Sequence, residues 1–210
     1  MKLPPQVPST GNALSRIVGR ALMRVTGWRF VGEFPDVPRF VCLVAPHTSN
    51  WDFFVALAAK WALGLGATWI GKNSIFRWPV AGFLRRIGGV PVDRNSPHGV
   101  VHQMVDAFAT APRMVFVLAP EGTRKRVEHW RSGYWHVAHE ARVPIVPVGL
   151  DYARKTVVIG PPLVTSSALE PDEAQLRAFY ATVRGKRPEN YYSGASSELE
   201  NRAVRKSSET

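Results

Sequence analysis

The sequence has little that would support a disulfide-stapled or membrane-spanning protein. Its 210 residues include one cysteine, Cys42, so no intramolecular disulfide can form and a reducing compartment is expected. No apolar run reaches the roughly 18 residues that a spanning helix needs, because Lys60 interrupts the longest candidate. The first ten residues also lack the apolar centre of a secretory signal. These absences predict a soluble or peripheral protein.

Acidic residues are also scarce. The chain has 27 Lys and Arg against 16 Asp and Glu, which gives a formal net charge of +11 and a pI near 10.4. Such a field favours anionic partners, namely nucleic acid, anionic lipid headgroups or phosphorylated ligands. The apolar content of 45% is ordinary, and the length suits one domain with a proper core.

Strand-like and helix-like segments alternate along most of the chain. We expect strands at 39–45, 67–71, 88–94, 113–119, 143–152 and 154–160, and helices at 51–66, 74–87, 98–110, 132–142 and 171–184. Alternation of this kind predicts an α/β fold. The expected fold class is a single α/β domain with a mostly parallel or mixed central sheet flanked by helices.

The two ends of the chain differ from this pattern. Residues 1–30 form an N-terminal segment whose stretch 12–28 is predicted to be an amphipathic helix, with Arg16, Arg20 and Arg24 on one side and aliphatic residues on the other. Residues 31–184 form the domain, and 185–210 are expected to be a flexible polar tail. The helix either lies on an anionic membrane or packs on the domain with its arginines in water. The net charge favours the membrane.

The stretch "APHTSNWDFF" at 45–54 places a histidine and an aspartate at a strand-to-helix junction. If Ser49 or Asn50 caps the helix, Asp52 lies in its first turn, where the helix dipole favours a carboxylate. Its side chain then leans back toward the loop of His47. A carboxylate beside an imidazole selects its tautomer and supports the imidazolium. An isolated pair of this spacing is also compatible with a capping aspartate and an incidental loop histidine.

Two further stretches carry polar groups suited to a phosphate. "LAPEGTRKR" at 118–126 follows the strongest predicted strand and brings Glu121, Gly122, Thr123 and Arg124 to a strand end, where α/β ligand sites usually lie. "GGVPVDR" adds a glycine at position 89 and Arg94, five residues later. Arginines at both places would clamp one phosphate.

These stretches together resemble the glycerolipid acyltransferase family of the lysophosphatidic acid acyltransferase type. His47 and Asp52 match its H-x4-D block, Gly89 and Arg94 its G-x4-R block, and residues 120–124 its P-E-G-T-R block. A proline-containing strand at 144–148 matches the fourth. The likeness covers about residues 40–152. Ala119 departs from it, because the family usually has an aromatic residue there.

The resemblance implies that an acyl group moves from acyl-CoA or acyl carrier protein to a hydroxyl of a lysophospholipid, with 1-acylglycerol-3-phosphate as the expected acceptor. His47 would be the general base and Asp52 its orienting partner. Arg94 and Arg124 would hold the acceptor phosphate, in a site that also includes Gly122 and Thr123, with Glu121 fixing the loop or an arginine. Neither a metal nor a bound cofactor is expected. The implied partners are the thioester donor, the lysolipid and an anionic membrane surface, at the cytoplasmic face, without nucleic acid.

Two alternatives remain open at this point. A non-enzymatic protein that binds anionic membranes or nucleic acid would explain the charge, although not the combination of His47, Asp52 and the 120–124 loop. An acyltransferase acting on a different lipid acceptor would keep the same base and donor.

Overall fold

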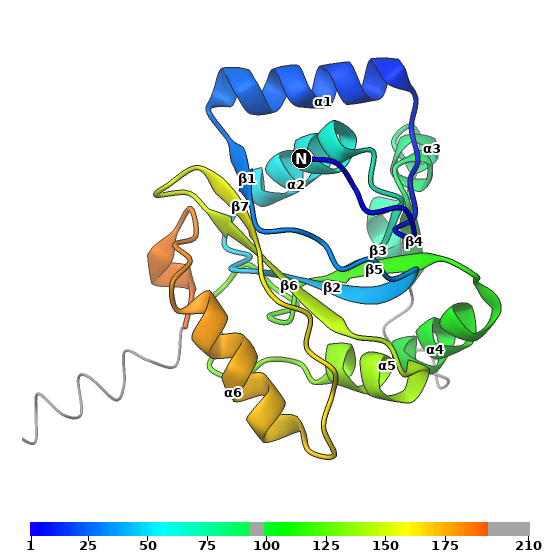
Figure 1. The fold of residues 1–210 in the computed structure, drawn as a ribbon, viewed down its shortest axis with the longest axis vertical. Coiled ribbons are helices and arrows are strands. Elements are labelled where there is room, and N and C mark those ends of the chain that lie inside the picture. Colours follow the sequence, from blue (N-terminus) through cyan, green and yellow to red (C-terminus); the bar gives the residue numbers. More distant parts are fainter. Residues whose placement is uncertain (93–98, 193–210) are drawn as a thin grey trace, which may run out of the picture.

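A seven-stranded mixed sheet forms the centre of the molecule in the computed structural model, which describes residues 1–92 and 99–192 (Figure 1). The strand order is β1-β7-β6-β2-β5-β3-β4, and every pairing is parallel except β6 with β7. The strands are β1 (Arg29–Val31), β2 (Arg39–Ala45), β3 (Ala67–Lys72), β4 (Gly89–Val92), β5 (Met114–Leu118), β6 (Ile145–Asp151) and β7 (Thr156–Ile159).

Helices cover both faces of this sheet. One side carries α1 (Ala13–Thr26), α2 (Trp51–Leu63) and α3 (Ala81–Arg86), and the other carries α4 (Val100–Thr110), α5 (Gly133–Ala141) and α6 (Leu169–Tyr180) (Figure 1). Short 3-10 turns lie at Asn73–Ile75 and Pro188–Asn190. All of β6 is buried, as expected for a strand covered on both faces. The predicted fold class is confirmed.

The segment 74–87 differs from its prediction as one helix. The structure has a 3-10 turn at Asn73–Ile75 and a short helix that begins only at residue 81. Pro79 accounts for the break, because proline lacks the N–H that a helix interior needs and disfavours a helical residue before it. Strand β1 was not predicted, because its three residues are too few for a periodic pattern.

The N-terminal helix packs on the domain through the face that carries Gly19 and Met23. Gly19 and Met23 of α1 are buried, and the Arg20 Nε donates to the Ala62 carbonyl of α2 at 3.4 Å. The aliphatic side chains face outward, with Val25 86% exposed. Arg20 and Arg24 are exposed and Arg16 is half-buried, so the docked helix holds most of its arginines in water while its aliphatic side chains are exposed as well.

Residues 185–192, expected to begin a flexible tail, return to the domain. The Arg187 N–H donates to the Thr48 Oγ1 at 3.2 Å, and the Lys186 Nζ lies 5.6 Å from the ring centroid of Trp51. Gly185 is buried against Thr48, where an added Cβ would lie 2.9 Å from Oγ1. The domain thus extends past residue 184, and residues 193–210 lie outside the described part.

Candidate active site

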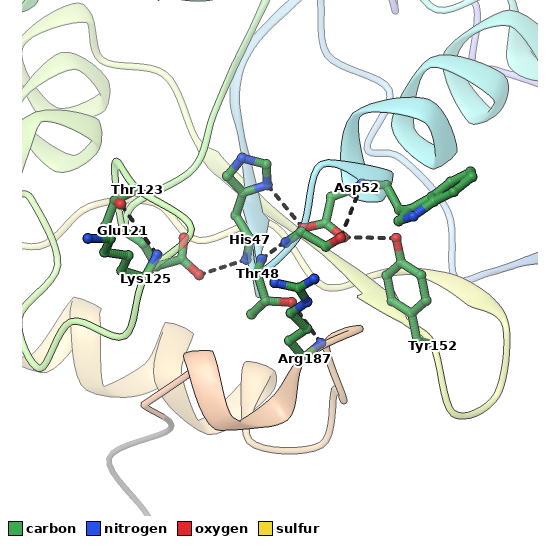
Figure 2. Close-up of polar contacts among 10 residues, drawn as sticks. His47, Thr48, Asp52, Glu121, Thr123, Lys125, Tyr152 and Arg187 are labelled. Carbon is green, nitrogen blue, oxygen red and sulfur yellow. Dashed lines mark hydrogen bonds and ion pairs between the residues drawn. The ribbon is translucent and has the colours of Figure 1, made fainter.

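Three neighbouring parallel strands end at one edge of the sheet, and each delivers a polar residue there. In the order β6-β2-β5, Tyr152 follows β6, His47 follows β2 and Glu121 follows β5. The carboxyl edge of parallel strands is the usual place for an α/β ligand site. Figure 2 shows these side chains gathered around the loop that leads into α2.

Asp52 is the centre of this arrangement. Its side chain is almost fully buried, and its Oδ2 accepts the N–H groups of Thr48 and Ser49, each at 2.8 Å. The Tyr152 hydroxyl donates to Oδ1 at 2.8 Å. Burial alone would raise the pKa of Asp52, but the hydrogen bonds from His47, Ser49 and Tyr152 outweigh it, so the pKa lies below its usual range. The carboxylate is therefore ionised at neutral pH.

The same carboxylate orients His47. The His47 Nδ1 lies 3.2 Å from the Asp52 Oδ2, and an ionised carboxylate can only accept a hydrogen bond. Nδ1 therefore carries the proton, which leaves the lone pair on Nε2. The imidazole is about a quarter exposed and lines a groove in the protein, so this lone pair is available to a ligand. The predicted pair is brought together.

Glu121 fixes its loop, which is one of the two roles expected of it. It is 4% exposed, and its Oε1 accepts the His47 N–H at 2.9 Å. Burial raises the pKa of this carboxyl, against the hydrogen bond from His47. Glu121 ties the loop after β5 to the loop after β2, and so fixes the position of the histidine backbone.

The other residues of the 120–124 loop lie at the groove. Gly122 has a φ of 63°, a left-handed conformation that glycine adopts without strain. Gly122, Thr123 and Arg124 line the same groove as His47, and Arg124 is exposed. Gly89 begins β4. Arg94, the second predicted arginine, lies outside the described residues.

The groove itself is lined by apolar side chains and by cationic ones. It has a volume of about 1440 Å³ and runs past Phe53, Leu57, Trp69 and Phe83. The charged side chains that line it within the described part of the chain are Asp52, Lys60, Arg124, Lys125, Arg131 and Arg187. All but the buried aspartate are cationic. Such a site suits an amphipathic ligand with an anionic head and an apolar chain.

Tyr152 is a site residue that the sequence analysis missed. It directly follows β6, the strand that carries the fourth block, and Trp28 packs edge-on against its ring at 4.9 Å between centroids. The signal was weak, because one tyrosine after a strand is ordinary and its partner Asp52 lies 100 positions earlier in the chain. Only strand order reveals that the two meet.

Comparison with known proteins gives consistent matches. Residues 33–151 match the model of the Acyltransferase family. The chain is similar to a 1-acyl-sn-glycerol-3-phosphate acyltransferase of Cocos nucifera, with 26% identity over 67% of this chain and 47% of the relative. A protein of the same name from Escherichia coli is 31% identical over 50% of this chain and 44% of the relative. The chain spans about half the length of these curated relatives.

A solved structure shares the fold. The 1-acyl-sn-glycerophosphate (LPA) acyltransferase PlsC from Thermotoga maritima superposes with a TM-score of 0.58 at 17% identity, over 79% of this chain and 75% of the other.

Proposed function

The chain belongs to the Acyltransferase family, and from this premise we propose that it transfers a fatty acyl group from a thioester to the hydroxyl of a lysophospholipid. The donor is acyl-CoA or acyl carrier protein, and the acceptor is 1-acylglycerol-3-phosphate, the substrate class in the names of the relatives. The observation that carries the proposal is the His47–Asp52 pair in a groove lined by apolar and cationic side chains.

The proposed reaction begins with the lone pair of the His47 Nε2. It takes the proton of the acceptor hydroxyl as the oxygen attacks the thioester carbonyl carbon, while Asp52 stabilises the imidazolium. The carbon–sulfur bond then breaks, and the imidazolium returns its proton to the departing thiolate. The products are the ester and the free thiol. No bound cofactor or metal enters this scheme, because the thioester is already an activated acyl group.

In this scheme, different parts of the groove bind the anionic head and the acyl chain. The anionic head of the acceptor lies beside Arg124, which lines the groove and provides a bidentate donor for a phosphate. The acyl chain lies along the apolar wall formed by Phe53, Trp69 and Phe83. Both reactants then meet at one base, and positioning of this kind supplies much of the rate enhancement in transfer reactions.

We also assign an anionic membrane surface, at the cytoplasmic face, as a partner. No helix within residues 1–92 and 99–192 is both long and apolar enough to cross a bilayer. The outward face of α1 exposes Leu14, Ile17 and Val25. Exposed aliphatic residues gathered on one helix face are costly in water. An interfacial helix that buries this face among headgroups removes that cost.

Acyl transfer to vesicle-borne lysophosphatidate tests the function. We expect the protein to form phosphatidate with acyl-CoA or acyl-loaded carrier protein as the donor. The transfer rate of His47→Ala should be at least about 100-fold lower. Circular dichroism and a thermal melt of the variant establish that it is folded. A folded His47→Ala variant with substantial activity contradicts the mechanism. A wild-type protein that transfers to no lysolipid contradicts the function.

A further inference from the structure

The segment that follows the last helix forms one side of the candidate active site. Its backbone is held at Thr48 by the Arg187 N–H, and its Lys186 Nζ lies 5.5 Å from the ring centroid of Tyr152 and 5.6 Å from that of Trp51. Thr48 is the residue next to His47, and the Tyr152 hydroxyl donates a hydrogen bond to Asp52. Figure 2 shows Arg187 beside this loop. The segment therefore contacts Thr48, which adjoins His47, and Tyr152, which is hydrogen-bonded to Asp52.

The Arg187 side chain has the properties of a ligand-binding group. It is exposed and lines the groove together with His47 and Arg124. No carboxylate in residues 1–92 and 99–192 forms an ion pair with it. A guanidinium is always charged and offers planar, bidentate donors that fit a phosphate. Residue 187 lies outside the range 33–151 that matches the family model, so the family match assigns it no role.

We propose that Arg187 binds the phosphate of the acceptor lipid, as a specificity residue supplied by the segment 185–190. This inference rests on the proposed acyl transfer. In 1-acylglycerol-3-phosphate, the reacting hydroxyl and the phosphate are on adjacent glycerol carbons. An acceptor with its hydroxyl at the His47 Nε2 therefore has its phosphate close to the His47 loop, where Arg187 is anchored. The phosphates of acyl-CoA lie at the far end of a long pantetheine arm from the thioester.

The side chain of Arg187 can be changed without removing its anchor. The hydrogen bond to Thr48 comes from the backbone N–H, which glutamine and lysine both keep. Arg187→Gln removes the charge, and Arg187→Lys keeps the charge but loses the bidentate fork. Arg184→Gln provides the matched control, because Arg184 is exposed in the same stretch of chain and does not line the groove.

Steady-state kinetics with a short-chain lysophosphatidate separate the acceptor from the donor. We expect Arg187→Gln to raise the acceptor KM by about tenfold, the loss typical of one hydrogen bond to a charged group, with an unchanged donor KM. Arg187→Lys should have a smaller effect, and Arg184→Gln should match the wild type. A rise in the donor KM alone would assign Arg187 to the phosphates of the thioester carrier and overturn the proposal, as would unchanged values for both substrates.

A binding measurement keeps the inference separate from the catalytic proposal. Calorimetric titration compares the same lysophosphatidate with a monoacylglycerol of equal chain length, below the concentration at which either forms micelles. Arg187→Gln should weaken binding of the phosphate-bearing lipid about tenfold and leave binding of the monoacylglycerol unchanged. Equal weakening of both lipids contradicts phosphate recognition. If the wild type transfers no acyl group, the catalytic proposal fails while this titration still decides the role of Arg187.

Discussion

At the residue scale, the candidate site depends on a buried carboxylate that has partners at both of its oxygens. Asp52 accepts two backbone N–H groups, the His47 ring and the Tyr152 hydroxyl. A buried carboxylate without such partners would be protonated rather than ionised. The local loop, together with Tyr152 from a distant strand, therefore holds Asp52 in the ionised state that selects the histidine tautomer.

Replacement of that tyrosine tests its positioning role. Tyr152→Phe removes the donor to the Asp52 Oδ1, and loss of a hydrogen bond to a charged group costs about 1.5–3 kcal/mol. We expect kcat to fall about tenfold or more with little change in either KM, because the ring and its packing remain. A purely structural role would leave the kcat of the folded variant unchanged.

The same variant has a pH signature. A carboxyl whose pKa is depressed in the folded state adds stability above its unfolded pKa of about 3.9 and loses it as the pH falls through the folded value. Tyr152 supplies part of the depression at Asp52. The free energy of unfolding of Tyr152→Phe should therefore lie below that of the wild type at pH 7, and the difference should narrow below about pH 4. A pH-independent difference contradicts this linkage.

Lys60 offers a second test at this scale. It lines the groove, and burial lowers the pKa of its ammonium, so the charged form costs stability. That cost is present below the folded pKa and fades as the pH rises toward the unfolded value of about 10.4. Lys60→Met should raise the melting temperature at pH 7 and gain less at pH 10. The exposed Lys2→Met serves as control, and a gain that is equal at both pH values contradicts the prediction.

At the element scale, α1 approaches α2 closely because one position has no side chain. A Cβ on Gly19 would lie 2.3 Å from the Ala62 nitrogen, a backbone atom that cannot move aside alone. Small residues permit such close approach between helices. The contact holds the Gly19 and Met23 face of α1 on the domain and leaves its aliphatic side outward, whereas an amphipathic pattern usually places the aliphatic side against the core.

Gly19→Ala should therefore destabilise the protein, although alanine favours an isolated helix by about 1 kcal/mol. Hydrogen exchange of the α1 amides should become faster, and the melting temperature should fall. Gly82→Ala in α3 is the matched control, because a Cβ there meets nothing within 4 Å, and it should be neutral or stabilising. Equal effects of the two substitutions would mean that α1 does not depend on this close contact.

At the scale of the whole molecule, two features support membrane binding. The net charge of +11 acts by electrostatic attraction, and the outward face of α1 acts by burial of aliphatic side chains. Basic residues near an anionic surface contribute about 1 kcal/mol each and are screened by salt. Aliphatic burial is not screened in this way. The two contributions can therefore be separated by the ionic strength and by the residues that are changed.

The corresponding prediction concerns vesicle flotation. The wild type should bind vesicles containing anionic phospholipid better than neutral ones, and added salt should weaken this preference. Leu14→Ser, Ile17→Ser and Val25→Ser together should reduce binding to both kinds of vesicle. Val164→Ser, at an exposed aliphatic residue outside α1, should have no effect. Undiminished binding by the triple variant would show that another surface meets the membrane.

The amino-acid sequence by itself determined the local features of this protein. Alternating apolar segments specified the strands and helices around the sheet, because each pattern is set by the periodicity of its own residues. The spacing of His47 and Asp52 specified their contact, since both lie within one strand–loop–helix unit. The four blocks also carried the family resemblance, as each is a short contiguous stretch.

Tertiary structure alone decided the features that join distant parts of the chain. The order β6-β2-β5 brought Tyr152 and Glu121 to the His47 loop, and the return of residues 185–192 placed Arg187 there. The direction in which α1 faces likewise depended on Gly19 meeting α2. Contacts of this kind leave no periodic signal in a sequence, because they depend on strand order and on the fit of two surfaces rather than on the pattern of either one.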